Sequence, residues 1–170
     1  ADGGAPFVTS SSSASYAGID VDMAAALADQ LGLKLELVDV AGNASSALAD
    51  GDVDIVMSQT STEKSSTMWV SDPYIETGVA LFASNGSTTV PESVQASSIA
   101  AQSSSTSAWA VQNAFGDDVL NPASDLVSAF SLVETGKSQY VAADAVIGSY
   151  AALVQSIDVQ PIALLGSKGG

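Results

Sequence analysis

The stretch Gln139-Tyr140-Val141-Ala142-Ala143-Asp144 decides the fold, because an apolar run ends there in an acidic residue just before a helical pattern over 145–155. Such a run predicts a buried strand followed directly by a helix. The same unit recurs earlier, with strands expected at 98–102 and 119–120 and helices at 107–115 and 124–135. Strands that alternate with helices predict an α/β fold with parallel sheets and crossover helices.

The first half of the chain shows the same alternation. An apolar helical period over 20–31 ends at Gly32, a residue suited to a helix C-terminus. The other elements expected here are strands at 6–10, 34–40, 52–58 and 78–83, a helix at 44–49 and a short helix within 59–67. The Asn85-Gly86-Ser87 break predicts a crossover between two lobes. We therefore expect lobe 1 at 1–84, a hinge at 85–89, lobe 2 at 90–160 and a last strand within 161–170.

Composition excludes several functional classes. The 170 residues include four lysines, no arginine, no histidine, no cysteine and 19 acidic residues, for a net charge of −15. Such a surface repels nucleic acid and anionic lipid, so we expect neither as a partner. Thiol catalysis, Ser-His-Asp chemistry and the usual zinc sites need residues that this chain lacks. The alternating carboxylates of 50–54 lack the spacing of a calcium loop, and we expect no metal or other cofactor.

Several short motifs resemble the extracellular solute-binding proteins of family 3, the amino-acid receptors of ABC importers. The motifs lie in the family's order from residue 6 to 165. They are Gly18-Ile19-Asp20-Val21-Asp22-Met23-Ala24, Ala47-Leu48-Ala49-Asp50-Gly51-Asp52-Val53-Asp54-Ile55, Ser71-Asp72-Pro73-Tyr74, Gln102-Ser103-Ser104-Ser105-Thr106 and Gly136 with Tyr140-Val141-Ala142-Ala143-Asp144. The resemblance implies a two-lobed, type II periplasmic-binding-protein fold, with solute held between the lobes at the carboxyl ends of the strands.

Ser105, Thr106 and Asp144 are the expected solute-binding residues of lobe 2. Ser105 and Thr106 match the family's Ser-Thr pair, and hydroxyls at a helix N-terminus favour an anionic group. Ser104 stands where the family has glycine, a residue that permits close backbone approach. Asp144 matches the aspartate that binds the solute's ammonium group. The alternative is that these residues only cap their own helices.

The expected solute contacts of lobe 1 are less specific. Lys64 lies where amino-acid-binding members have an arginine that clamps the solute's carboxylate, but lysine offers a point charge and no planar fork. Its alternative is a solvated lysine paired with a nearby carboxylate such as Glu63. Ser58 and Gln59 follow a strand and are candidate polar contacts. Tyr16 and Trp69 are candidates for an aromatic wall, with core packing as the alternative.

Three functions remain open. The resemblance favours a receptor that captures a small polar solute, amino-acid-like and cationic or zwitterionic, for an ABC permease. We expect it to be a monomer that is secreted or held at the cell surface, lipid-anchored or periplasmic, after removal of a signal peptide. A degenerate or truncated binding or sensor domain is the second function, and a cyclohexadienyl dehydratase on the same fold is the third. The chain's end also leaves two alternatives: residues 161–165 return to lobe 1, which is favoured, or the return is absent.

Overall fold

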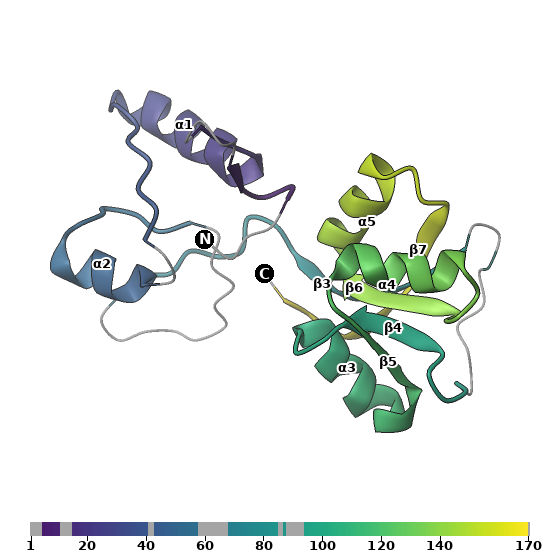
Figure 1. Cartoon of the computed structure of the whole chain (residues 1–170). Helices are drawn as coiled ribbons and strands as arrows, with labels where there is room; N and C mark the ends of the chain where they lie inside the picture. The colour runs from purple at the N-terminus through teal and green to yellow at the C-terminus, as the bar shows by residue number, and fades with distance from the viewer. Residues whose placement is uncertain are drawn as a thin grey trace. The chain divides into compact units, whose positions relative to one another are not determined.

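The structure is a computed structural model that describes residues 5–10, 15–40, 43–57, 68–84, 87 and 94–169. Its contacts divide the chain into two units, Ala1–Thr60 and Ser61–Gly170 (Figure 1). Each unit has its own helices and its own strands, and each is described separately below.

The second unit is built on a five-stranded sheet with the order β5-β4-β6-β3-β7. Its strands are β3 (Thr77–Ser84), β4 (Ile99–Gln102), β5 (Leu120–Ala123), β6 (Tyr140–Asp144) and β7 (Val159–Gly169). β4 runs parallel to both β5 and β6, whereas β3 runs antiparallel to β6 and β7. The sheet is therefore mixed, and its parallel part is the trio β5-β4-β6.

Three helices cover this sheet: α3 (Thr106–Phe115), α4 (Leu126–Glu134) and α5 (Ala145–Val154). α4 and α5 lie on one face and α3 on the other (Figure 1). Each face has its own buried cluster, because successive strand residues point to opposite sides. Phe82, Phe130 and Val141 belong to the first cluster, and Leu81, Ile99 and Val111 to the second. All six of these side chains are fully buried.

The first unit contains two helices and one short hairpin among its described residues. The hairpin pairs β1 (Thr9–Ser10) with β2 (Tyr16–Ala17). The helices are α1 (Ile19–Leu31) and α2 (Ala44–Asp50), and each ends at a glycine with positive φ, Gly32 at 66° and Gly51 at 77°. The stop that the sequence predicts at Gly32 is thus confirmed, and Gly51 ends α2 in the same conformation.

Two predicted strands of the first unit are wrong within the described residues. Residues 34–40 and 52–57 belong to no ladder, and Ser58 lies outside the described part of the chain. The alternation of apolar residues in 34–40 indicates which side chains share a face, but a strand exists only when its backbone pairs with another. The expected short helix within 59–67 also falls outside the described residues.

The expectation of purely parallel sheets is wrong for the second unit. Parallel pairing holds along β4-α3-β5-α4-β6, where a helix separates consecutive strands. β3 precedes this series and β7 follows it, and these two strands pair antiparallel with each other. β7 is also longer than the expected 161–165, because it follows β3 along most of its length.

The observed division differs from the expected lobes at 1–84, 85–89, 90–160 and 161–170. β3 falls in the second unit because it pairs with β6 and β7, and no described strand of the first unit pairs with it. The lobe boundaries of a working receptor stay a prediction. Among the described residues, no helix is both long and apolar enough to cross a membrane.

Candidate functional site

The carboxyl ends of β5, β4 and β6 form one edge of the second unit's sheet, because these strands are neighbours and run parallel. A polar residue at or just after each strand also caps the next helix. Ser105 caps α3, Asp125 caps α4 and Asp144 caps α5. This edge, defined by Ser105, Asp125 and Asp144, is called the carboxyl edge below. Polar side chains and helix N-termini meet there, as in ligand sites of open α/β sheets.

Asp144 is held from two sides. Its Oδ1 accepts hydrogen bonds from the backbone N–H groups of Val146 at 2.9 Å and Ile147 at 3.0 Å. Its Oδ2 accepts one from the hydroxyl of Thr77 on β3 at 2.7 Å. The capping role that the sequence offers as an alternative is therefore present. A carboxylate oxygen can accept a second hydrogen bond, so the half-buried Asp144 can cap α5 and also receive a donor from a solute.

Ser105 also caps its helix, since its hydroxyl accepts a hydrogen bond from Ala108 N–H at 3.1 Å. Thr106, the first residue of α3, is exposed. Ser104 adopts a left-handed φ of 58°, the conformation that glycine adopts without strain. Ser103 ties the loop to the end of β5, because its backbone N–H and its hydroxyl both donate to the Ala123 carbonyl, at 2.8 and 2.9 Å.

Asp125 is a residue of this edge that the sequence prediction missed. Its Oδ1 accepts from Ser128 N–H at 2.7 Å, and its Oδ2 accepts from the Ser124 hydroxyl at 3.0 Å. Hydrogen bonds from the backbone and side chain of Ser128, and then from Ser124, lower the pKa of Asp125 below 3.8. The signal was the Ser124-Asp125 pair before an apolar helical period, but the helix was expected to start at Ser124 and not to be capped there.

The structure brings Ser105, Thr106 and Asp144 to one edge, and it places the other predicted residues elsewhere. Ser58, Gln59 and Lys64 lie outside the described residues. Tyr16 belongs to β2 in the first unit and is partly buried. Trp69 lies before β3 and is 87% exposed, so core packing does not explain it.

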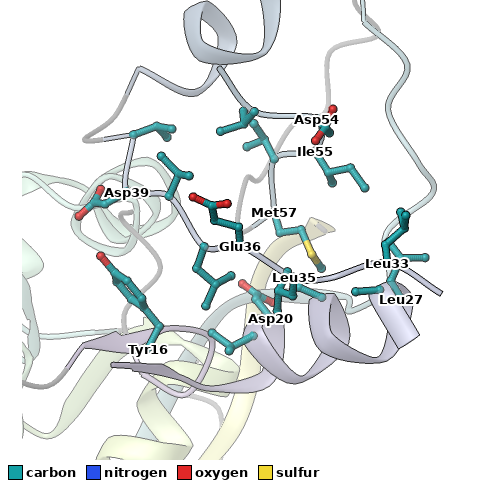
Figure 2. Close-up of a pocket in the computed structure, with 18 of the residues that line it drawn as sticks. Tyr16, Asp20, Leu27, Leu33, Leu35, Glu36, Asp39, Asp54, Ile55 and Met57 are labelled. Carbon is teal, nitrogen blue, oxygen red and sulfur yellow. The ribbon is translucent and has the colours of Figure 1, made fainter. Parts of the chain in front are cut away.

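A hollow of about 520 Å³ lies within the first unit, between α1 and the segments 33–40 and 52–57. Figure 2 shows Leu27, Leu33 and Leu35 around it, together with carboxylates such as Glu36 and Asp54. Most of its lining is apolar and comes from the residues expected to pack between helix and sheet. We interpret it as incompletely filled interior of the first unit, because its apolar lining comes from α1 and from the two segments that the sequence predicts as strands beneath it.

No metal site is found among the residues that the structure describes, since no group of three or more His, Cys, Asp or Glu side chains there could hold an ion. The chemistry available at the carboxyl edge is hydrogen bonding and charge. Two carboxylates attract cationic donors, while the N-terminus of α3 beside Ser105 and Thr106 suits a negative group. This combination can accommodate a zwitterion.

Comparison with known proteins identifies the family. The model of the bacterial extracellular solute-binding proteins, family 3, matches residues 1–158. An ancestral cationic amino acid solute-binding protein, AncCDT-1, is 25% identical with a TM-score of 0.80, over 97% of this chain and 74% of its own. The second substrate-binding domain of a putative amino acid ABC transporter from Streptococcus pneumoniae is 21% identical with a TM-score of 0.76, over 98% and 80%.

A third similar structure is the holo form of ArgBP from T. maritima, 22% identical with a TM-score of 0.59, over 98% of this chain and 76% of its own. Among curated proteins, none matches the sequence. The expected two-lobed, type II periplasmic-binding-protein fold is confirmed by the family match and by these structures. The chain belongs to the bacterial extracellular solute-binding proteins of family 3.

Proposed function

We propose that this chain is the receptor of an ABC importer and binds an amino-acid-like solute that is cationic or zwitterionic. The observation that carries the proposal is the carboxyl edge of the second unit, where Asp144 and the Ser105–Thr106 pair lie at the ends of neighbouring parallel strands. A carboxylate and a helix N-terminus at one edge match the ammonium and carboxylate of an amino acid.

Charge supports a cationic or zwitterionic solute over an anionic one. The net charge of −15 raises the local concentration of cations around the molecule and repels anions. The absence of arginine removes the residue best suited to clamp a carboxylate with two parallel hydrogen bonds. The names of two similar structures, a cationic amino acid solute-binding protein and an arginine-bound protein, agree with this choice.

The remaining predicted roles are part of the same proposal. Asp144 would accept from the solute's ammonium group, and Ser105 and Thr106 would donate to its carboxylate. Lys64, Ser58 and Gln59 would supply polar contacts, and Tyr16 and Trp69 an aromatic wall. A receptor of this class delivers solute to a membrane permease from outside the cytoplasm, so we place the mature chain in the periplasm or at the cell surface.

Calorimetry and thermal shift with arginine, lysine, ornithine, glutamine and glutamate test the proposal. We expect saturable binding of a cationic or zwitterionic member, with a rise in Tm that grows with solute concentration. Asp144→Asn should weaken that binding about tenfold or more, because it removes the negative charge that strengthens the hydrogen bond to the solute's ammonium group. Asp158→Asn removes one exposed charge away from the carboxyl edge and should leave the affinity within about twofold. No stabilisation by any member of the panel would contradict the proposal.

The description of AncCDT-1 raises a second candidate function. Another structure of this ancestral amino acid-binding protein, 26% identical to this chain, is described as a precursor of cyclohexadienyl dehydratase. A dehydratase needs a positioned acid or base, and this chain has neither histidine nor arginine. An assay of prephenate and arogenate turnover separates the two functions. We expect no turnover of either compound. Measurable turnover that the Asp144→Asn substitution abolishes would show that the chain is an enzyme and would contradict the receptor function.

A further inference from the structure

Thr77 joins two strands at the carboxyl edge through its side chain. It is the first residue of β3, and Asp144 is the last residue of β6. The two strands run antiparallel with Val79 opposite Asp144, so Thr77 lies just beyond the end of their pairing. Its hydroxyl donates a 2.7 Å hydrogen bond to Oδ2 of Asp144, and both residues are half-buried. The contact therefore connects residues 67 positions apart at the edge where the solute is proposed to bind.

The two oxygens of Asp144 differ in what they can still accept. An ionised carboxylate has about four acceptor positions, about two on each oxygen. Oδ1 already accepts from the backbone N–H groups of both Val146 and Ile147. Oδ2 accepts from Thr77, which leaves one position on this oxygen. The ammonium group of a solute would therefore meet Asp144 at Oδ2, on the side that the Thr77 hydroxyl does not occupy.

The helix cap by itself does not fix the direction of this remaining position. The terminal torsion of an aspartate side chain is broad, so a carboxylate held only at Oδ1 can still turn its other oxygen. The hydrogen bond from Thr77 holds Oδ2 as well. Threonine is β-branched and stiff at χ1, so its hydroxyl is a well-defined anchor. Hydrogen bonds weaken steeply when they are misaligned, and the direction of Oδ2 therefore matters for a donor on the solute.

We propose that Thr77 is a positioning residue of the solute site, which holds Oδ2 of Asp144 in the direction that receives the solute's ammonium group. The inference rests on the proposed receptor function. Thr77 belongs to none of the sequence motifs that indicate the family, and its role follows from the pairing of β3 with β6 and from the hydrogen bond between the two side chains.

Calorimetry with arginine, lysine, ornithine, glutamine and glutamate tests this role. Thr77→Val removes the hydroxyl at nearly constant shape and should weaken the binding of the amino acid that the unmodified chain binds about 3- to 10-fold. Thr77→Ala should give a similar loss without placing a methyl group against the carboxylate. Thr77→Ser keeps the hydroxyl and should restore the affinity to within about twofold. Thr135→Val is the matched control and should leave the affinity within about twofold, since the Thr135 hydroxyl donates to the Ser131 carbonyl at the far end of α4.

A double-mutant cycle shows whether Thr77 acts through Asp144. Asp144→Asn removes the charge that strengthens the contact with the ammonium group, so Thr77→Val added to this variant should weaken the remaining binding by less than about twofold. A purely structural role for Thr77 predicts the same loss in both backgrounds. Urea denaturation and circular dichroism of each variant measure its stability and folding separately from its affinity.

Three results would overturn the inference while the receptor function stands. They are unchanged affinity in both hydroxyl-free variants of Thr77, failure of Thr77→Ser to restore the affinity, and an equal loss from Thr77→Val in the Asp144→Asn background. If Thr77→Val does not fold, Thr77→Ala takes its place in the cycle. If the unmodified chain binds no member of the panel, the receptor function fails and this inference falls with it.

Discussion

At the scale of single residues, Gly148 lets α5 lie close to β3. A Cβ at this position would stand 2.6 Å from Cζ and 2.7 Å from Cε2 of the Phe82 ring. Phe82 is fully buried and packs edge-to-face on Phe130, with 5.9 Å between ring centroids. The ring therefore has little room to move, and the side chain at 148 is limited to a hydrogen atom.

Gly148→Ala should therefore destabilise the second unit. Overpacking typically costs about 1–3 kcal/mol, while alanine gains about 1 kcal/mol of helix propensity over glycine. We expect a net loss of up to about 2 kcal/mol in the free energy of unfolding, measured by urea denaturation. Ser149→Ala, at the exposed neighbouring position, is the control and should change stability by less than about 0.5 kcal/mol. A Gly148→Ala variant more stable than the parent would show that the two elements do not pack this closely.

At the scale of elements, each parallel strand of the second unit is followed by a helix whose N-terminus is capped by a side chain. At Asp125, hydrogen bonds from Ser128 and Ser124 favour the charged form of the carboxyl group and lower its pKa. Because this pKa is lower in the folded chain than in the unfolded chain, the ionised Asp125 stabilises α4 fully at pH values above the usual pKa of 3.8. That contribution is lost as the pH falls through the folded-state pKa.

The titration of Asp125 can be followed by NMR of its carboxyl carbon. We expect a midpoint below 3.8, and a shift back toward 3.8 in Ser124→Ala, which removes one donor to Oδ2. The Ser128 backbone donor remains in that variant, so the return should be incomplete. A midpoint at or above 3.8 in the parent protein would mean that Asp125 does not cap α4 in solution.

At the scale of the whole molecule, the two units differ in how much they bury. The second unit holds two clusters of fully buried side chains on the two faces of its sheet. Among the described residues of the first unit, only Ala44, Ala47 and Asp20 are buried, and leucines such as Leu31 and Leu33 are more than half exposed. Hydrophobic burial is the main stabilising term, so the second unit should be the more stable of the two.

Hydrogen exchange read by mass spectrometry measures this difference along the chain. Amides of β3, β4 and β6 should exchange at least about 100-fold more slowly than those of residues 33–40 and 53–57, which belong to no ladder. The same measurement with saturating solute should show slower amide exchange, because a receptor with bound solute unfolds less often. Uniform protection across both units would show that segments 33–40 and 53–57 are paired in solution.

How much could be predicted from the sequence depends on how local each feature is. Glycine stops, helix periods and the caps at Ser105 and Asp144 involve residues a few positions apart, so the sequence alone indicates them. The cap at Asp125 is equally local, but the prediction begins that helix at Ser124 and so places Asp125 inside it. The motif order also identified the family, which the family match over residues 1–158 confirms.

Sequence by itself determined the α/β class, the helices and the likeness to solute-binding proteins, because these depend on periodicity and on short motifs. Only the tertiary structure decided that β3 and β7 pair antiparallel beside the parallel trio, that residues 34–40 and 52–57 form no described ladder, and that Trp109 is left in solvent. Strand pairing joins residues far apart along the chain, and the exposure of a side chain depends on every element packed around it. Neither the pairing of a strand nor the exposure of a side chain can therefore be predicted from the few residues that flank it in the sequence.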